Sequence, residues 1–341
     1  MAKPSICILP QLKTTGGPSS FQSKLKAGMG DRGIDVHHDI SREGTQALLI
    51  TGATRNLGAL IEARRRGIHI IQRLDGMNWL HKRHATGLRH YLRSERMNLQ
   101  LALIRRWFAD MIIFQSAFTR DWWNRVYGVL NKPYAVIHNG ADLVNFNRSG
   151  SGFIPKDFIR ILVVEGSFKG GHERDLLNAW EFANCLSESL GKKVELSVAG
   201  SVPEELRNCI STIGLTSVNW LGIVAHEQIP ELDRSAHLLF PAEINAACPN
   251  SLVEALACGL PVAGYATGSI SELVGEDGGA VVPYGSDYWK LEAPDTEGLV
   301  FAASRVLEKL PHYQRSARKR AKTFFGLDRM VEAYQKILLS N

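Results

Sequence analysis

The sequence predicts an α/β protein with two domains, each built on a doubly wound parallel sheet. Apolar, β-branched runs recur along the chain, and most are followed by a turn signal and a longer helical pattern. Strands that alternate with helices form parallel sheets covered by helices on both faces. The alternation stops at an Asn-, Ser- and Gly-rich stretch, residues 145–157, and then restarts. Because 341 residues suffice for two domains of about 150–180 residues, we expect a linker there.

The expected elements follow from these runs. Strands in the first half are expected at 5–10, 47–52, 68–76, 110–116 and 134–140, with helices near 19–32, 55–66 and 118–127. Strands in the second half are expected at RILVVEG (160–166), VELSVAG (194–200), SVNWLG (217–222), AHLLFPAE (236–243), LPVAGYA (260–266) and GAVVPYG (279–285). Most of these runs are separated by helical patterns, and the tail over 315–339 also has a helical pattern.

The composition is typical of a soluble globular protein, with 45% hydrophobic and 22% charged residues. The five cysteines include no CxxC pair, which argues against a disulfide framework or a zinc site and fits a reducing compartment. The eleven histidines form no HExxH motif, so no metal site is expected. The start has too short an apolar core for a signal peptide, and no run of 18 apolar residues occurs. We therefore expect a cytoplasmic protein.

Positive charge is concentrated in the first half of the chain. Residues 1–150 hold 22 Lys and Arg against 10 Asp and Glu, a balance of +12, whereas residues 151–341 hold 18 against 24, a balance of −6. The segment 81–107 holds seven basic residues and one acid, with Leu88, Tyr91, Leu92, Met97, Leu101 and Ile104 at roughly helical spacing. Such a segment suits an anionic membrane surface or a phosphate-bearing acceptor. The alternative is a core-facing helix with a solvated basic side; no nucleic-acid motif occurs, so nucleic acid is not an expected partner.

Two glycine turns in the first half suggest ligand sites. TGATRNLG (51–58) is similar to the turn of short-chain dehydrogenases, but Arg55 replaces the glycine that lets the backbone approach a pyrophosphate. No tyrosine is followed by lysine four residues later, so a nicotinamide site is not expected. TTGGPSS (14–20) lies between a strand and a helix, where Gly16 and Gly17 would let backbone amides approach a phosphate or sugar.

The segment PNSLVEALACGLP (249–261) predicts a helix that carries one acid near its start. Ser251 and Glu254 have the spacing of a capping box, in which the carboxylate only caps its own helix. Gly259 followed by Pro261 supplies the matching stop. The alternative is that Glu254 binds a ligand.

Several segments together support the second alternative, because they resemble a known family. PNSLVEALACGLPVAGYATGSISELV is similar to the core signature of the retaining glycosyltransferases of family 4, glycosyl transferases group 1, which have the GT-B fold. IHNGAD (137–142), SVAG (197–200), WLGIVAHEQIPEL (220–232) and AHLLFPAE (236–243) follow in the family's order, and TTGGPSSF resembles its first glycine loop. The resemblance implies two facing Rossmann-like domains, an acceptor-side domain over 1–150 and a donor domain over 151–314. It also implies a helix over 315–341 that returns to the first domain.

The resemblance also implies roles for individual residues. Glu254 would bind the nucleotide ribose, while Asn250, Ser251 and Leu252 would turn helix amides toward the diphosphate, whose charge the helix dipole favours. Ile223 and Val224 would border the base, and Lys169 would stabilise the leaving diphosphate. In the first domain, Arg73 and Asp75 are candidates to contact the sugar or diphosphate, and a capping role for Asp75 is the alternative. No Asp-x-Asp pair occurs, so the reaction is expected to need no metal and no cofactor beyond the nucleotide-sugar co-substrate.

The sequence departs from the family pattern at two positions. Ala246 stands where the family has the first acid of its Glu-x7-Glu pattern, and Glu243 or Asn245 are the candidates to replace it. Ser167 stands where the family has an arginine, whose role falls to Arg174 or to an arginine of the first domain.

These features predict a retaining glycosyltransferase that moves a sugar from a nucleotide-diphosphate donor to a hydroxyl acceptor, expected to be a lipid-linked or cell-envelope glycan. The expected location is the cytoplasm, with peripheral contact to the inner face of the plasma membrane. The alternatives are a non-catalytic nucleotide-sugar-binding protein and a nucleotide-sugar epimerase.

Overall fold

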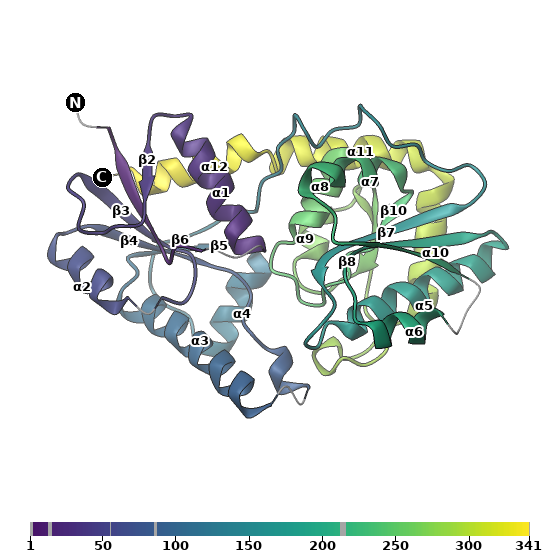
Figure 1. Ribbon diagram of the computed structural model, residues 1–341, viewed down its shortest axis with the longest axis horizontal. Coiled ribbons are helices and arrows are strands. Elements are labelled where there is room, and N and C mark those ends of the chain that lie inside the picture. The colour runs from purple at the N-terminus through teal and green to yellow at the C-terminus, as the bar shows by residue number, and fades with distance from the viewer. Residues whose placement is uncertain (1–2, 13–15, 55, 85–86, 212–215, 341) are drawn as a thin grey trace. The chain divides into compact units, whose positions relative to one another are not determined.

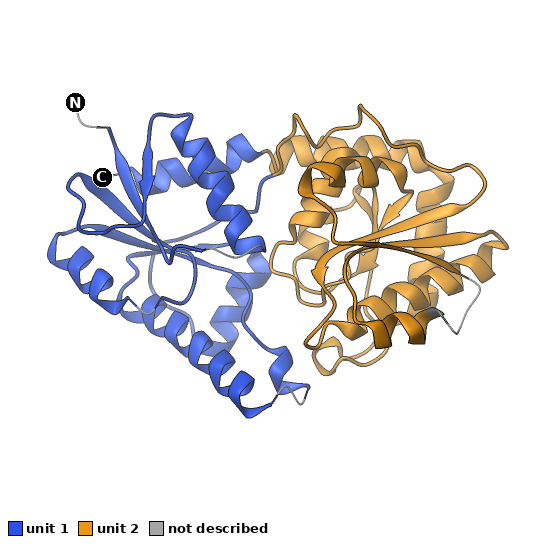
Figure 2. Cartoon of the chain, in the orientation of Figure 1, with its two compact units in different colours: residues 1–140, 327–341 blue, residues 141–326 orange. Residues whose placement is uncertain are grey.

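The computed structural model describes residues 3–12, 16–54, 56–84, 87–211 and 216–340. The chain divides into two compact units: residues 1–140 with 327–341, and residues 141–326 (Figure 2). The tail that the sequence suggests as one helix forms two. Helix α11 (Leu310–Phe324) belongs to the second unit and α12 (Leu327–Leu338) to the first. The helix breaks where the buried ring of Phe325 packs into the core of the second unit and its carbonyl accepts from the Ala141 amide at 2.8 Å.

The first unit contains a parallel sheet with strand order β2-β1-β3-β4-β5-β6 (Figure 1). Its strands are β1 (Ser5–Leu9), β2 (Asp35–His37), β3 (Thr45–Ile50), β4 (His69–Leu74), β5 (Met111–Phe114) and β6 (Tyr134–Val136). Its helices are α1 (Gly17–Gly30), α2 (Leu57–Arg65), α3 (Leu88–Trp107), α4 (Ala117–Tyr127) and α12, with a short 3-10 turn, η1 (Leu80–Lys82).

Alternate residues of the central strands serve two cores. Ile6 and Ile8 of β1 pack with α1 and α12 on one face, whereas Cys7 and Leu9 pack with α2 on the other. This period of two follows from the strand geometry, which turns successive side chains to opposite faces. Burial on both faces explains why the strands read as continuous apolar runs in the sequence.

The second unit contains a parallel sheet with strand order β12-β11-β10-β7-β8-β9. Its strands are β7 (Ile159–Ser167), β8 (Val194–Ser201), β9 (Ser217–Gly222), β10 (Leu238–Leu239), β11 (Val262–Tyr265) and β12 (Gly279–Val282). Its helices are α5 (Glu173–Leu190), α6 (Glu204–Ser211), α7 (Ile229–Ser235), α8 (Asn250–Cys258), α9 (Ile270–Val274), α10 (Thr296–Glu308) and α11, with the 3-10 turns η2 (His226–Gln228) and η3 (Tyr288–Lys290). One core joins strand residues to α8, α9 and α11.

The prediction of an α/β chain with two parallel, doubly wound sheets is confirmed. The sequence did not indicate β2, because its three residues, Asp-Val-His, form no apolar run. The strand expected over 236–243 shortens to two residues because Pro241 lacks the amide hydrogen that a central strand needs.

Candidate functional site

The predicted donor residues lie on segments that leave the carboxyl ends of strands in the second sheet. Lys169 follows β7, Ile223 follows β9, and Glu243 follows β10, while α8 starts from the loop after β10. Since all strands of this sheet are parallel, these segments leave from the same edge of the sheet. That edge is where open α/β sheets bind ligands.

Helix α8 starts at Asn250, and its N-cap is Pro249, with no side chain capping the helix. Ser251 is therefore the second residue of the helix, and the capping-box alternative for Ser251 and Glu254 is wrong. The side chain of Leu252 is fully buried, so that only its backbone amide is available to a ligand. The first amides of a helix lack intrahelical acceptors and carry partial positive charge, which suits an anion. The predicted stop is confirmed: Gly259 is the C-cap, with φ 74°.

Glu254 faces the loop after β9. Its carboxylate is 4% exposed, and its Oε1 lies 3.0 Å from Nε2 of His226, a half-exposed side chain on η2. Burial and the negative charge of Glu254 hold the pKa of nearby Asp233 well above its usual range. The Glu254 carboxylate thus favours the protonated form of Asp233.

Two predicted residues are presented to solvent. Ile223 follows Gly222, which has φ 68°, and its side chain is 83% exposed, although Val224 packs against the α8 core. Lys169 is exposed and follows Phe168, which is 1% exposed and anchors the loop. The amide of Phe168 donates to Ser201 O at 2.9 Å. Arg174, a candidate to replace the family arginine, instead extends toward Glu181, 3.9 Å away.

A cluster of ionisable side chains, which we call the acid–histidine cluster, includes residues that flank Lys169 in the sequence. It consists of Glu165 at the end of β7, Glu243 after β10, and His172 and Asp175 at the start of α5. Burial, then the charge of Glu243, raises the pKa of Glu165 to about 8. Burial alone would lower the pKa of His172, but the Asp175 carboxylate at 2.8 Å and the charges of Glu243 and Glu165 raise it to about 9. The cluster therefore holds protons at neutral pH.

Stability should fall as pH rises through these values. The folded state holds the Glu165 proton up to about pH 8 and the His172 proton up to about pH 9, each above the ordinary pKa of that group. The free energy of unfolding that these protons contribute is therefore fully present below the ordinary pKa values. It is lost as the pH rises toward about 8 for Glu165 and about 9 for His172. We expect Glu165→Gln to flatten the decline, measured by chemical unfolding between about pH 5 and about pH 9. If the free energy of unfolding fell equally with pH in the wild type and in Glu165→Gln, the raised pKa of Glu165 would be contradicted.

The loop between Glu243 and Ala246 is tightly packed. Ala246 is fully buried in the α8 core, and its carbonyl accepts from the Ser269 amide at 2.9 Å. A Cβ on Gly268 would lie 2.6 Å from the Ala246 backbone. Asn245 has φ 63°, and both polar atoms of its buried side-chain amide lack a partner among the residues described. A buried amide of this kind is usually completed by water or by a ligand.

The first unit has a second group of predicted residues at the carboxyl edge of its sheet. Arg73 is 1% exposed and stacks on the Phe21 ring, 3.8 Å from its centroid. Its guanidinium donates to Asn139 Oδ1 at 3.1 Å and lies 3.6 Å from the Asp75 carboxylate. With its side-chain oxygen oriented toward Arg73, the Gln115 amide also accepts from this guanidinium. Arg73 therefore joins β4, α1 and the segment after β6, and burial raises the pKa of Asp75 despite the arginine.

The glycine loop also belongs to this edge. Gly16 precedes α1 with φ 140°, a conformation that requires glycine, and Gly17 is the first helical residue. Gln22 of α1 donates to Thr51 Oγ1 at 2.7 Å and to Pro10 O at 2.8 Å, which ties the loop to β3. Residues 13–15, and Arg55 of the dehydrogenase-like turn, lie outside the described residues.

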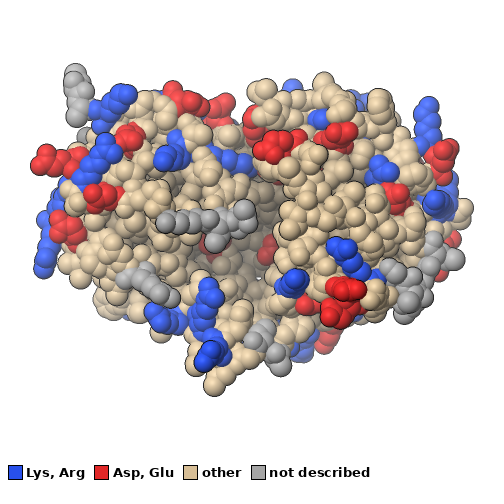
Figure 3. Space-filling model, in the orientation of Figure 1, with Lys and Arg blue, Asp and Glu red and all other residues tan. Residues whose placement is uncertain are grey.

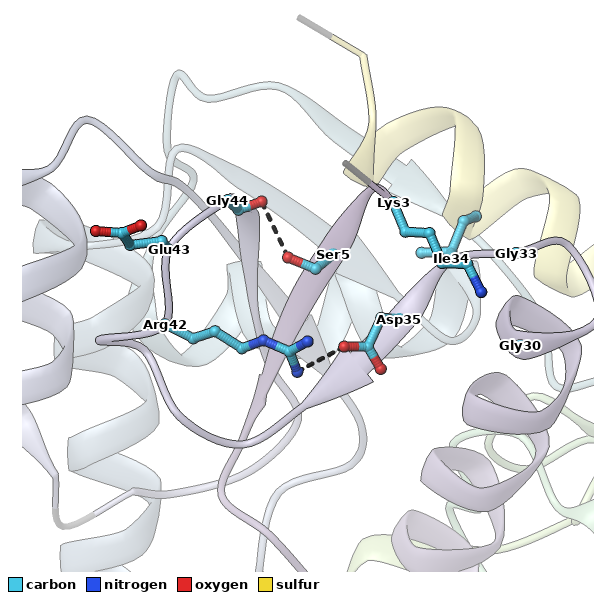
Figure 4. Close-up of a pocket in the computed structure, with 9 residues that line it drawn as sticks. All are labelled: Lys3, Ser5, Gly30, Gly33, Ile34, Asp35, Arg42, Glu43 and Gly44. Carbon is cyan, nitrogen blue, oxygen red and sulfur yellow. Dashed lines mark hydrogen bonds and ion pairs between the residues drawn. The ribbon is translucent and has the colours of Figure 1, made fainter. Parts of the chain in front are cut away.

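A pocket of about 500 Å³ lies at the opposite, amino edge of the first sheet (Figure 4). Asp35 and Arg42 line it and pair with each other at 2.6 Å. Across the pocket, Ser5 Oγ donates to Gly44 O at 2.9 Å. Since Asp35 and Arg42 satisfy each other and the pocket is remote from the carboxyl edge, it is not the candidate site.

Sequence reasoning missed several members of the second-unit site. His226 lies within the family-like segment 220–232 but was given no role, His172 carries no motif, and Glu165 reads as the end of an apolar strand. The only signal for Glu165 was its place directly before Gly166 at a strand end. In the ranges that the structure covers, no group of three or more His, Cys, Asp or Glu is arranged to hold a metal. Among those same residues, no helix has the length and hydropathy needed to cross a membrane.

Comparison with known proteins gives a family match within the second unit. Residues 170–308 match the family described as Glycosyl transferases group 1. Sucrose-phosphate synthase (tll1590) from Thermosynechococcus elongatus is similar over 98% of both chains, at 14% identity and a TM-score of 0.75. The chain has the GT-B fold. No curated protein matches the sequence.

Other solved GT-B structures are similar over nearly the whole chain. Anabaena Alr3699/HepE, in complex with UDP and glucose, is 15% identical, with a TM-score of 0.69 over 100% of both chains. WaaG, a glycosyltransferase involved in lipopolysaccharide biosynthesis, is 16% identical, with a TM-score of 0.67 over 99% of this chain and 100% of its own. At these identities the likeness establishes the fold alone.

Proposed function

We propose that this GT-B protein is a retaining glycosyltransferase that binds a nucleotide-diphosphate sugar at the carboxyl edge of its second sheet. The observation that carries the proposal is that one helix, α8, has both an amino terminus without a side-chain cap and a buried glutamate, Glu254. Both lie inside the segment that matches the glycosyl transferases group 1. Because each carboxylate oxygen can accept more than one hydrogen bond, Glu254 can hold His226 and also accept from ribose hydroxyls. The helix amides suit the diphosphate beside it.

The proposed step moves one glycosyl unit. The bond from the anomeric carbon to the diphosphate oxygen breaks, and that oxygen keeps the electron pair. The acceptor hydroxyl oxygen bonds to the same carbon from the same face, and its proton passes to the departing diphosphate. Lys169 and the α8 amides would stabilise the charge that develops on the diphosphate, which is how such sites lower the barrier. A requirement for no metal ion stays a prediction.

We propose uridine as the base to test first, because HepE was solved with UDP and with UDP-glucose. The acceptor, a lipid-linked or cell-envelope glycan, would bind to the first unit. WaaG, of the same fold, acts in lipopolysaccharide biosynthesis, which supports this class of acceptor.

In place of the family's first acid, we propose Glu243 and Asn245 as the groups that recognise the donor sugar. Asn245→Gly should relieve the left-handed backbone and remove the buried amide, leaving stability unchanged or higher by about 1 kcal/mol. The same change should weaken nucleotide-sugar binding by about tenfold while affecting UDP alone little. Thermal unfolding and calorimetric titration of both ligands measure this. A destabilised variant with unchanged sugar affinity would show that the amide serves the fold.

A panel of nucleotide sugars tests donor binding. We expect one donor, with UDP-sugars foremost, to raise the melting temperature of the purified protein, because a ligand that binds only the folded state stabilises it. No shift with any donor would contradict the proposal. The rival function, a non-catalytic nucleotide-sugar-binding protein, is favoured by Ala246 and predicts a shift with no turnover in the presence of any acceptor.

A further inference from the structure

Helix α3 of the first unit exposes several large apolar side chains. Five large apolar side chains, which we call the apolar stripe, are between 46% and 73% exposed: Leu88, Leu92, Leu99, Leu103 and Trp107. The buried side of the helix includes the apolar residues Leu101, Ala102 and Ile104 together with the polar residues Ser94, Asn98 and Arg105. A helix packed on a sheet normally turns its large apolar side chains inward, so the exposed ones of α3 are unusual. The alternative of a core-facing helix with a solvated basic side is wrong for Leu88, Tyr91 and Leu92, which are exposed, and right for Leu101 and Ile104, which are buried.

The apolar stripe runs the length of the helix. Its members are spaced by four or seven residues, which places them on one side of a helix of 20 residues, roughly 30 Å long. Helix α2 extends the apolar surface with Leu57 and Ile61, which are 48% and 46% exposed. The two helices are neighbours in Figure 1, and Arg64 of α2 donates to Trp107 O at 2.8 Å.

Polar groups on the buried side of α3 and at its end help to anchor the helix to the first unit. Asn98 accepts from the Asn78 amide at 3.0 Å and donates to Asn78 O at 2.8 Å. Lys132 donates to Arg105 O and Arg106 O, which caps the end of the helix. These contacts fix the orientation of α3, so the apolar stripe is held outward.

Positive charge borders the apolar stripe. Figure 3 shows basic side chains over α3 with no acidic side chains among them in that view. The exposed basic residues of α3 are Arg89, Arg93, Arg96 and Arg106. The single acid of the helix, Glu95, is held by His81 at 2.7 Å and Lys82 at 3.0 Å, and thus offsets little of this charge.

We infer that the α2–α3 face of the first unit binds an anionic lipid bilayer. Leucine side chains would enter the boundary between headgroups and acyl chains, the arginines would meet lipid phosphates, and Trp107 would lie at the interface. A second copy of the chain fits this face less well, because a two-fold contact would bring the arginines of α3 against the same arginines of its partner. The inference does not depend on glycosyl transfer, and its test uses neither donor nor acceptor.

Co-sedimentation with vesicles tests this inference. Vesicles of phosphatidylcholine with phosphatidylglycerol should bind the full chain at physiological salt, and vesicles of phosphatidylcholine alone should bind it weakly. Replacing Arg89, Arg93 and Arg96 with glutamine should lower the partition coefficient by roughly a hundredfold. The charge-matched control replaces Arg315, Lys319 and Lys322 of α11 with glutamine and should bind as the wild type does.

A second variant separates apolar insertion from charge. Replacing Leu92, Leu99 and Leu103 with serine should lower the partition coefficient by roughly tenfold or more, whereas Phe301→Ser, at a side chain 69% exposed on α10, should not. Because all these positions are exposed, the variants should fold, and their melting curves check this. The inference is overturned if the wild type shows no preference for anionic vesicles, or if the α3 variants bind like their controls. It is also overturned if the leucine variant converts a dimer to a monomer in sedimentation velocity, which would make the face an interface between copies.

Discussion

Glu254→Gln is expected to weaken nucleotide binding by roughly tenfold or more while leaving the melting temperature nearly unchanged. A carboxylate accepts charge-assisted hydrogen bonds from hydroxyls, and the neutral amide loses that strength. The fold loses little, because His226, its partner at 3.0 Å, has a half-exposed side chain. Removing the charge also removes one cause of the raised pKa of Asp233. Calorimetric titration with UDP and UDP-glucose, together with thermal unfolding, gives both quantities.

Two controls support the interpretation of Glu254→Gln. Glu188→Gln removes a glutamate on α5 that is exposed and lies near the helix end remote from the candidate site, and should change neither quantity. His226→Ala should weaken binding less than Glu254→Gln does, because His226 would act on the ligand through the carboxylate that it contacts. A large fall in melting temperature with intact nucleotide binding would mean that Glu254 serves the fold alone.

Arg73→Met is expected to destabilise the first unit by roughly 3 kcal/mol, because it leaves the Asp75 carboxylate largely buried without its cation. In a unit of this size that loss corresponds to about 10 °C in melting temperature. The guanidinium also stacks on Phe21 and bonds to Asn139, so its loss loosens three segments of the carboxyl edge. Chemical unfolding followed by circular dichroism measures the effect.

The double variant Arg73→Met with Asp75→Asn separates the pair from the packing. Replacing both members should recover part of the lost stability, since no buried charge then remains without a partner. Arg329→Met, at an exposed position of α12, is the control and should be neutral. An unchanged stability with a large loss of donor affinity would instead place the arginine on the ligand, as the family resemblance allows.

The fold was predictable because parallel strands buried on both faces appear as apolar runs in the sequence. SVNWLG (217–222) coincides with β9, and Gly259 ends α8 as expected, because a left-handed C-cap favours glycine. The same reasoning fails where tertiary structure decides. The Ser251 and Glu254 spacing fits a capping box, yet the helix starts at Asn250.

The candidate site was predictable only where a motif carried it. Glu254 follows from the family signature, but its partner His226 lies 28 residues away in sequence, in a segment whose resemblance to the family assigns that histidine no role. The acid–histidine cluster forms because the sheet brings β7 and β10 together, two strands whose residues are far apart in sequence. The exposed side of α3 was equally hidden, because a helical pattern of leucines does not show which side of the helix faces water.

Release of nucleotide from a nucleotide sugar tests the central claim most directly. The purified protein is incubated with the donor that gives the largest melting shift, with and without glycan acceptors, and free nucleoside diphosphate is measured over time. The proposal predicts release by the wild type, faster with an acceptor, and strongly reduced release by Glu254→Gln and Lys169→Ala at saturating donor. A donor that binds tightly but is never turned over, with every acceptor class supplied, would contradict glycosyl transfer and leave a nucleotide-sugar-binding protein.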